Sequence, residues 1–213
     1  AATTPALTSL PLIGREKEWS SLQRAYASIK NAGYLIVLEG EAGIGKTRLA
    51  EDFLAVVRSL GAGIIQARCF EGEDNLAYAP FVDGLGKAIE QAAQPDWHAS
   101  IPVPWLGEAA RLFPTLNKLR TDLPSPPSSE SPAAQTRFYT GLSQVVWALC
   151  ARQPPGVLFI DDIQWADEAS MDLLTYLVRR LHGQPMLILV TWRGEDLDAG
   201  HRLRRLLADA QRN

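Results

Sequence analysis

The sequence predicts an α/β fold in which a mostly parallel sheet carries helices on both faces, with a helical insertion between the second and third strands. Three observations support this prediction. Short apolar segments alternate with helical patterns along the 213 residues, as they do in doubly wound parallel sheets. The first apolar segment leads into GEAGIGKT at residues 40–47, a glycine-rich pattern that requires a strand before it and a helix after it. A later apolar segment ends in two aspartates, at 161–162.

The composition is that of a globular domain with a slightly acidic balance. Apolar residues make up 46% of the chain, and the formal net charge is −3. The apolar share excludes wholesale disorder, and the charge argues against a mainly electrostatic nucleic-acid binder. The apolar runs are too short to cross a bilayer, and no secretion signal is visible, so we expect a cytoplasmic domain without a membrane partner. Cys69 and Cys150 lack metal-type spacing and are expected to be buried thiols in a reducing compartment.

The first elements are a helix, a strand, a second helix and a second strand. Apolar residues recur at helical spacing over 14–30. The segment 33–40, GYLIVLEG, is nearly continuously apolar, as in a parallel strand that is covered on both faces. A helix over 46–60 follows, which GAG at 61–63 ends. Residues 63–70 predict the second strand.

The middle of the chain predicts the helical insertion, at about 75–150. One helix is predicted after Pro80, a short one between the prolines of 102–116, and a long one over 133–153. The segment 124–132 contains nothing but Pro, Ser and one Glu. This composition forms neither a helix nor a central strand, so we expect an exposed, mobile loop.

The last third returns to alternation. A strand is predicted over 154–162, and a helix over 167–182 with Asp167 as its N-cap. A fourth strand follows over 184–193, and then a basic helix over 201–213. For its basic residues His201, Arg202, Arg204 and Arg205 a solvated surface is favoured over contact with DNA or with a neighbouring subunit.

The segment 40–47 carries the first half of a site. Gly40, Gly43 and Gly45 let the backbone wrap with its N–H groups inward, and the next helix adds the positive end of its dipole. Lys46 supplies a mobile charge for the β and γ phosphates, and the Thr47 hydroxyl is placed to ligate Mg²⁺. The segment therefore predicts a site for a nucleotide polyphosphate with Mg²⁺.

Three charged residues at the ends of later strands predict the second half. Asp161 and Asp162 end the third strand, at the edge of the sheet where α/β proteins bind ligands. Asp161 would hold Mg²⁺ directly or through water, and Asp162 would polarise an attacking water as a general base. The alternative is that one aspartate caps the next turn. Arg193 follows the fourth strand and is either a contact to the γ phosphate or a solvated loop residue.

Five segments together resemble the nucleotide-binding domain of the STAND class of signalling ATPases, within the AAA-like P-loop NTPase superfamily (ASCE division). They are LIGREKEWSSL, GEAGIGKTRL, LAYAPFVDGL, VLFIDDIQWAD and LILVTWR. The similarity extends from Leu12 to about Leu207, and it is closest to the ATPase modules of large bacterial transcriptional regulators and of some adenylate cyclases. It implies an ATP-binding and ATP-hydrolysing molecular switch of a larger signalling or transcription-regulatory protein, with ATP or ADP and Mg²⁺ as cofactors.

The resemblance also implies roles for individual residues. Those placed near the adenine and ribose are Leu12, Ile13, Gly14 and Arg15. Those placed around the phosphates are Gly40, Glu41, Ala42, Gly43, Ile44, Gly45, Lys46, Thr47 and Arg48. The catalytic group is Lys46, Asp162 and Arg193, with Arg193 as first sensor, and the metal ligands are Thr47 and Asp161.

The domain organisation that follows is an N-terminal extension, 1–11, and a nucleotide-binding domain, 12–213. In proteins of this class a helical lid and a winged-helix domain follow the sensor strand, whereas this chain stops at Asn213. We therefore expect an excised domain that binds nucleotide and turns it over slowly. The expected partners are adenine nucleotide and further domains of the same polypeptide. Nucleotide-dependent self-association is left open, and direct contact of this domain with DNA is not expected.

Two other functions compete with the switch. A nucleic-acid ATPase of the loader or origin-recognition type shares the GREKE start, but the acidic balance and the lack of a recognisable DNA-reading module argue against it. A P-loop kinase for a small substrate needs a substrate pocket and an arginine-rich lid. The insertion is instead apolar, proline-rich and acidic or neutral around EGEDNLAYAP, which argues against a kinase.

Overall fold

The structure is a computed structural model, and it describes residues 14–73, 75–92, 96–124, 131–151, 153–194 and 202–210. The predicted extension 1–11 and most of the predicted loop 124–132 lie outside these residues. Within them, no helix is long and apolar enough to cross a membrane.

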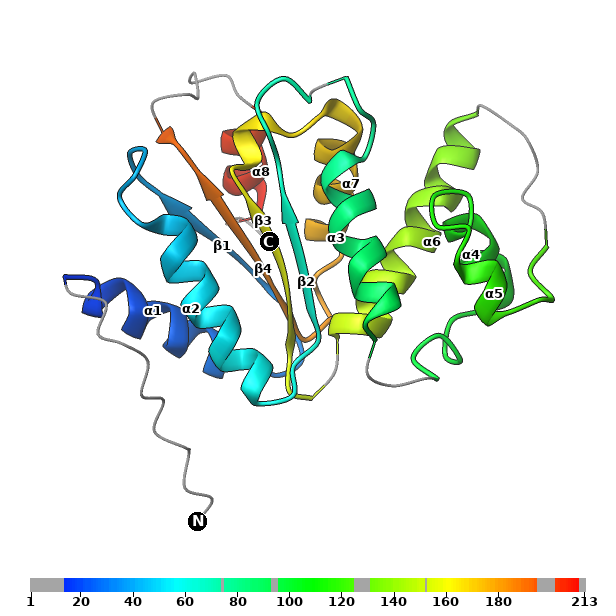
Figure 1. Cartoon of the computed structure of the whole chain (residues 1–213), viewed down its shortest axis with the longest axis horizontal. Coiled ribbons are helices and arrows are strands. Elements are labelled where there is room, and N and C mark those ends of the chain that lie inside the picture. The colour runs from blue at the N-terminus through cyan, green and yellow to red at the C-terminus, as the bar shows by residue number, and fades with distance from the viewer. Residues whose placement is uncertain are drawn as a thin grey trace, which may run out of the picture.

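A four-stranded parallel sheet forms the centre of the molecule (Figure 1). Its strands are β1 (Tyr34–Glu39), β2 (Ile64–Arg68), β3 (Gly156–Asp161) and β4 (Met186–Trp192). Their order across the sheet is β1-β4-β3-β2. The predicted α/β fold with a parallel sheet is therefore confirmed, and all carboxyl ends of the strands meet at one edge.

Two helices cover one face of the sheet. They are α1 (Glu16–Ala27) and α2 (Lys46–Ser59). Phe53 of α2 is 1% exposed and packs with Phe159 of β3 and Leu189 of β4 in one hydrophobic cluster. Side chains of odd-numbered residues in β3 and β4 face this side, because successive side chains of a strand alternate between faces.

The other face carries the remaining helices. They are α3 (Ala79–Glu90), α4 (Val103–Ala109), α5 (Leu116–Leu119), α6 (Pro132–Cys150), α7 (Glu168–Val178) and α8 (Arg202–Ala210), with a short 3₁₀ helix η1 (Ile163–Trp165) after β3. Helices α3 to α6 form the predicted insertion between β2 and β3, and α4 and α5 lie outside α6 (Figure 1). The sequence did not predict α5 or η1, which are too short to leave a helical period.

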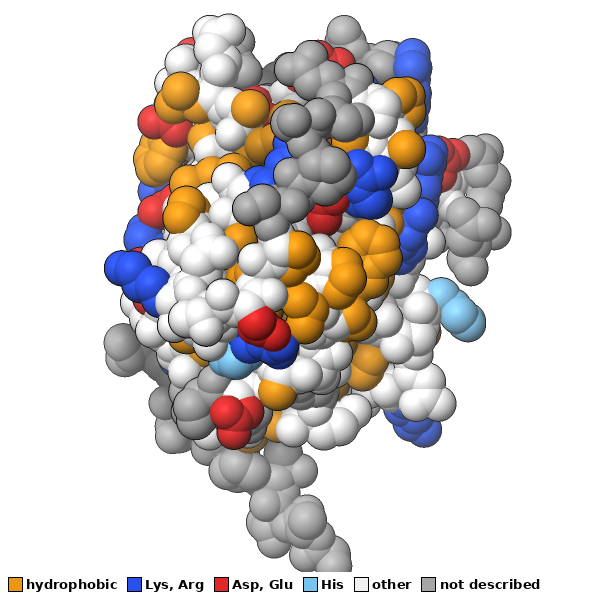
Figure 2. Space-filling view, turned by 90° about the vertical axis from the view of Figure 1, so that its right-hand side faces the viewer, with side chains coloured by type: hydrophobic (Ala, Val, Ile, Leu, Met, Phe, Trp, Pro, Cys, Tyr) orange, Lys and Arg blue, Asp and Glu red, His pale blue; other side chains and the backbone are white. Residues whose placement is uncertain are grey.

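The insertion is held to the sheet by close backbone contact. A methyl group on Gly84 of α3 would lie 2.7 Å from the carbonyl oxygen of Gln66 in β2. This contact allows α3 to cover the outer strand of the sheet. Inside the insertion, the buried carboxylate of Glu108 pairs with Arg137 at 3.1 Å and with Arg111 at 3.3 Å. Figure 2 faces the insertion and shows apolar side chains gathered near its centre, with both basic and acidic side chains around them.

Two local predictions have different outcomes. Asp167 is the N-cap of α7, as predicted: its Oδ1 accepts a hydrogen bond from the backbone N–H of Ser170 at 2.8 Å. The prediction that the first strand is covered on both faces is wrong for β1, whose end residue Tyr34 is 42% exposed and whose middle residues are half-buried. The reason is its position at one side of the described sheet. The fully buried strands are β3 and β4.

Candidate nucleotide-binding site

The loop between β1 and α2 has the backbone of an anion cradle. Gly43 and Gly45 have φ values of +75° and +91°, which side-chain-bearing residues rarely adopt. Gly45 is the N-cap of α2. Among the described residues, the N–H groups of Gly43, Ile44 and Gly45 donate no hydrogen bond to a loop or turn carbonyl. These donors and the N-terminus of α2 together suit a polyphosphate.

Lys46 lies over this loop at the start of α2. It is 7% exposed, and its Nζ donates hydrogen bonds to the carbonyl oxygens of Gly40 and Glu41, each at 2.8 Å. The lysine ammonium and the loop N–H groups therefore come from the same short segment. Residues 41–45 of the loop are exposed, with Ile44 at 47%.

Three side chains form a row across the carboxyl ends of three neighbouring strands, on the α2 face; we call it the strand-end row. Strand pairing sets Arg68 of β2 directly beside Asp161 of β3. It pairs Ile160 with Val190 and so brings Thr191 of β4 beside Asp161 on the other side. The Oγ1 of Thr191 donates to Asp161 Oδ1 at 2.6 Å.

The strand-end row meets the phosphate loop at Thr47. The hydroxyl of Thr47 donates to the Asp161 carboxylate, at 3.0 Å from Oδ1 and 3.1 Å from Oδ2. Asp161 is 2% exposed and Thr191 is fully buried. The fold thus brings together the two predicted metal ligands, which are 114 residues apart in the chain.

Asp162 has a strained backbone and several partners. Its φ of 53° and ψ of 46° are left-handed, a conformation that non-glycine residues adopt mainly at functional sites and turns. Its N–H donates to Thr191 Oγ1 at 2.8 Å, and its Oδ1 accepts from Gln164 Nε2 at 3.2 Å. Arg68 Nη2 lies 3.6 Å from its Oδ2, and Arg193 Nε lies 3.7 Å from its Oδ1. The carboxylate therefore lies between two guanidinium groups.

The predicted adenine segment reaches the phosphate loop at Arg15. Its guanidinium donates a 2.5 Å hydrogen bond to the carbonyl oxygen of Ile44 and lies 3.6 Å from the Glu18 carboxylate. Gly14 is described and has a φ of +82°. Leu12 and Ile13 lie outside the described residues, so their contact with adenine stays a prediction.

The chain matches the model of a known protein family. Residues 11–190 match the model of the family described as AAA ATPase domain. The chain belongs to the AAA ATPase domain family. The description of this family, an ATPase domain, implies that its members bind a nucleotide. One curated relative, the uncharacterized protein R02095 of Rhizobium meliloti (strain 1021), is 26% identical over 211 residues, covering 92% of this chain and 20% of that protein. The chain therefore spans about a fifth of the length of the curated relative it matches.

The donor set of the AAA ATPase domain fits Mg²⁺ that arrives with a nucleotide. Thr47 and Asp161 offer one hydroxyl and one carboxylate at the end of the loop. The described residues contain no group of three or more His, Cys, Asp or Glu side chains that would hold a metal by themselves. Mg²⁺ in nucleotide sites takes one or two protein oxygens and completes its shell with phosphate oxygens and water. The two residues therefore suit a metal that the nucleotide helps to bind.

One predicted contact receives no support from side-chain geometry. The side chain of Arg48 is 69% exposed and lies 3.9 Å from Asp52, one turn further along α2. Among the described residues it forms no ion pair with Asp161 or Asp162. The backbone N–H of Arg48 lies in the first turn of the helix, so a contact from this group stays a prediction.

Sequence reasoning missed three residues of the AAA ATPase domain that contact the acidic pair: Arg68, Gln164 and Thr191. Gln164 donates to Asp162 from η1 and accepts from the N–H of Arg193 at 3.3 Å. A signal existed for two of them, because Arg68 and Thr191 each stand at the end of an apolar segment that predicted a strand. Parallel pairing places such end residues beside Asp161.

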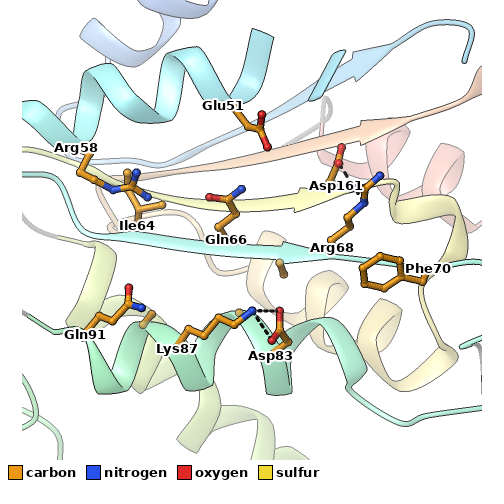
Figure 3. Close-up of a pocket in the computed structure, with 13 residues that line it drawn as sticks. Glu51, Arg58, Ile64, Gln66, Arg68, Phe70, Asp83, Lys87, Gln91 and Asp161 are labelled. Carbon is orange, nitrogen blue, oxygen red and sulfur yellow. Dashed lines mark hydrogen bonds and ion pairs between the residues drawn. The ribbon is translucent and has the colours of Figure 1, made fainter. Parts of the chain in front are cut away.

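A groove of about 390 Å³ opens beside the acidic pair (Figure 3). Its floor is the α2 face of β2, with Gln66 in the middle and Arg68 at one end, and its walls are α2 and α3. Asp161 lines the same end as Arg68, and Arg58 lines the opposite end. The groove therefore leads along the sheet to the carboxylates.

Cys69 directly follows β2, and its side chain lies in the hydrophobic cluster on the face of the sheet opposite α2. It is 4% exposed, and its N–H donates to the carbonyl oxygen of Asp161 at 3.0 Å. Burial, followed by the charges of Asp167, Asp162 and Asp161, raises the pKa of the Cys69 thiol to about 12. The thiol stays protonated near neutral pH and is not a nucleophile for this site. Both cysteines are buried thiols, as predicted.

Proposed function

We propose that this AAA ATPase domain is an ATP-dependent molecular switch of the STAND class, within a larger signalling or transcription-regulatory protein. The observation that carries the proposal is the meeting of the two halves at Asp161. Thr47 of the phosphate loop and Thr191 of β4 both donate to this carboxylate. The length of the curated relative, of which the chain covers 20%, supports a role as one domain among others.

The binding half uses charges and N–H groups that the loop already orients. Lys46 contacts the β and γ phosphates, and the N–H groups of the loop surround them. Thr47 and Asp161 would hold Mg²⁺. The metal would neutralise negative charge on the phosphate oxygens.

The chemical step is assigned to Asp162. Its side chain is 13% exposed, so it can contact a water while most of its surface is shielded. It accepts a proton from the attacking water as a general base. The pairing of Asp162 with Arg193 limits the freedom of the carboxylate and keeps it next to the group that senses the γ phosphate.

The switch itself is assigned to Arg193. Its guanidinium lies 3.7 Å from Asp162, and its N–H contacts Gln164 of η1. A γ phosphate offers the guanidinium a second anion, so ATP and ADP leave Arg193 in different positions. Trp192 precedes Arg193, and Trp165 ends η1. The partners proposed are the further domains of the same polypeptide, with nucleotide-dependent self-association as a second form of output.

Nucleotide affinity tests the proposal directly. Arg193→Gln should weaken binding of a non-hydrolysable ATP analogue by roughly 10- to 100-fold, the worth of one charged hydrogen bond, and leave ADP binding nearly unchanged. The matched control is Arg179→Gln, a change of an arginine that is 61% exposed and pairs with Asp209 at 3.9 Å. Equal losses for both nucleotides would contradict the sensor role.

Tryptophan fluorescence tests the change of state. We expect the ATP-analogue and ADP complexes of the wild type to differ in emission, because Trp165 and Trp192 adjoin the residues that respond. The two complexes of the Arg193→Gln variant should give the same spectrum. Identical spectra of the two wild-type complexes, with both nucleotides bound, would remove the basis for a switch at this position.

A further inference from the structure

Arg68 is a basic residue at the acidic pair to which the proposed function gives no role. It ends β2 and is the strand-pairing partner of Asp161. Its Nε lies 3.6 Å from Asp161 Oδ2, and its Nη2 lies 3.6 Å from Asp162 Oδ2. Figure 3 shows its side chain pointing to Asp161 at the end of the groove. One guanidinium thus bridges both carboxylates.

The two sides of this bridge differ in burial. The side chain of Asp161 is 3% exposed, whereas that of Arg68 is 54% exposed. Asp161 is fixed by the hydroxyls of Thr47 and Thr191. Arg68 instead has its guanidinium carbon 5.5 Å from the centre of the exposed ring of Phe70. The carboxylate therefore cannot move without losing buried contacts, whereas the guanidinium can move into the open groove.

Arg68 compensates the charge of the buried Asp161 carboxylate. A buried carboxylate is stable when an opposite charge pairs with it. Among the described residues, Arg68 is the basic side chain that forms an ion pair with Asp161. The two other basic side chains nearby have different partners: Arg193 pairs with Asp162, and Lys46 donates to loop carbonyls. A divalent cation on Asp161 would supply the same compensation. The guanidinium and the metal thus meet the same need of one carboxylate.

We propose that Arg68 competes with Mg²⁺ for Asp161. Arg68 neutralises the carboxylate when the metal–nucleotide complex is absent, and it moves away along the groove when the complex binds. This inference rests on the proposed function, because it takes Asp161 as a ligand of Mg²⁺. A divalent cation on Asp161 would repel a guanidinium only a few ångströms away, so the two cations weaken each other's binding to the carboxylate. Arg68 consequently lowers the apparent affinity of the site for Mg²⁺.

The test is a Mg²⁺ titration of the 213-residue chain at a fixed concentration of fluorescent ADP, with binding as the signal. Arg68→Gln should reach half-maximal Mg²⁺-dependent binding at a roughly two- to fivefold lower Mg²⁺ concentration than the wild type, the range expected from an exposed ion pair. Binding of ADP in EDTA should stay at the wild-type level. The matched control is Arg58→Gln, which removes the same charge from the opposite end of the groove and should leave the Mg²⁺ requirement unchanged.

A second variant keeps the test decisive if Arg68→Gln fails to fold, as judged by circular dichroism. Arg68→Lys retains a charge but loses the planar fork that reaches two carboxylates. Its Mg²⁺ requirement should therefore lie between those of the wild type and Arg68→Gln. An unchanged or higher Mg²⁺ requirement in the folded Arg68 variants, with ADP binding intact, would overturn the proposal. So would an equal shift in Arg58→Gln. A wild type that binds no ADP, with or without Mg²⁺, would instead refute the proposed function, and this inference with it.

Discussion

The phosphate loop and the strand-end row build one site by different physical means. Residues 41–45 of the loop are exposed, and they present backbone groups held by glycine conformations. Asp161 and Thr191 of the row are buried, and they satisfy one another with side chains from neighbouring strands. A substitution that removes a charge at the loop should therefore leave the core undisturbed. A change in the row leaves a buried group without its partner.

This difference separates two kinds of mutational effect. Changes in the loop should reduce nucleotide binding and leave the free energy of unfolding nearly intact. Changes at the buried positions of the row should reduce both, because an unsatisfied buried donor or acceptor retains its full desolvation cost. Asp162, with its side chain 13% exposed, lies between the two cases.

The largest effect is expected for hydrolysis in Asp162→Asn. Loss of the general base should slow phosphate release by roughly 10²- to 10⁴-fold, while ADP affinity stays nearly unchanged, because a base acts in the chemical step. Single-turnover phosphate release and ADP titration measure the two quantities. Asp161→Asn is the comparison, and it should impair the Mg²⁺-dependent part of both. Equal losses of affinity in the two variants, with hydrolysis otherwise intact, would dissolve the division of roles.

A smaller effect, on affinity, is expected for Lys46→Ala. Removing the ammonium should weaken ADP binding by roughly 100-fold, the worth of a strong charged contact. The unfolding free energy should fall by about 1 kcal/mol or less, because the bonds lost are to carbonyls of an exposed loop. The neighbouring exposed residue gives the control, since Arg48→Ala should change neither quantity. A loss of stability in Lys46→Ala as large as that of a row variant would abolish the contrast between loop and row.

The stability of the row is tested by Thr191→Val, a change of similar shape. It removes the donor to Asp161 and the acceptor for the Asp162 N–H. The free energy of unfolding without nucleotide should fall by roughly 1–3 kcal/mol in urea titrations.

Two further variants serve as controls for the loss of stability in Thr191→Val. Thr191→Ser retains the hydroxyl and should recover most of the stability. Thr175→Val removes a hydroxyl that donates to Met171 within α7, and it should cost about 0.5 kcal/mol or less. A loss no larger in Thr191→Val than in Thr175→Val would show that the row is not a stabilising network.

The smallest effect is expected on stability at alkaline pH, and it concerns Cys69, the residue that follows β2. The folded pKa of Cys69, about 12, lies above the ordinary value of 9.0, so the folded state retains a proton that the unfolded state loses. Stability is unaffected below pH 9 and falls as the pH rises from 9 toward 12. Between pH 8 and 10 the wild type should lose about 1 kcal/mol more than Cys69→Ala. Tyr26, whose pKa burial raises to about 12, contributes equally in both proteins. Parallel curves for the two proteins would show that the thiol is not buried in solution.

The same contrast explains what the sequence predicted. The phosphate loop could be predicted because its glycines, Lys46 and Thr47 lie within eight consecutive residues. The acidic pair at the end of β3 and the Asp167 cap could be predicted for the same reason, because each depends on a short local pattern. The position of Arg68 beside Asp161 depends on pairing between β2 and β3, which a long helical insertion separates in the chain. Neither residue alone signals that register. The short helix α5 and the half-buried state of β1 also depend on tertiary packing rather than on local pattern.

The most direct test of the account is calorimetric titration of the chain with ADP, once with Mg²⁺ and once with EDTA. The central claim is that the buried row completes the site that the exposed loop begins. Binding should therefore occur in both conditions and be clearly tighter with Mg²⁺, and Asp161→Asn should abolish the difference while leaving the binding in EDTA. Equal affinities with and without Mg²⁺ in the wild type, or no heat of binding at millimolar ADP, would contradict the claim.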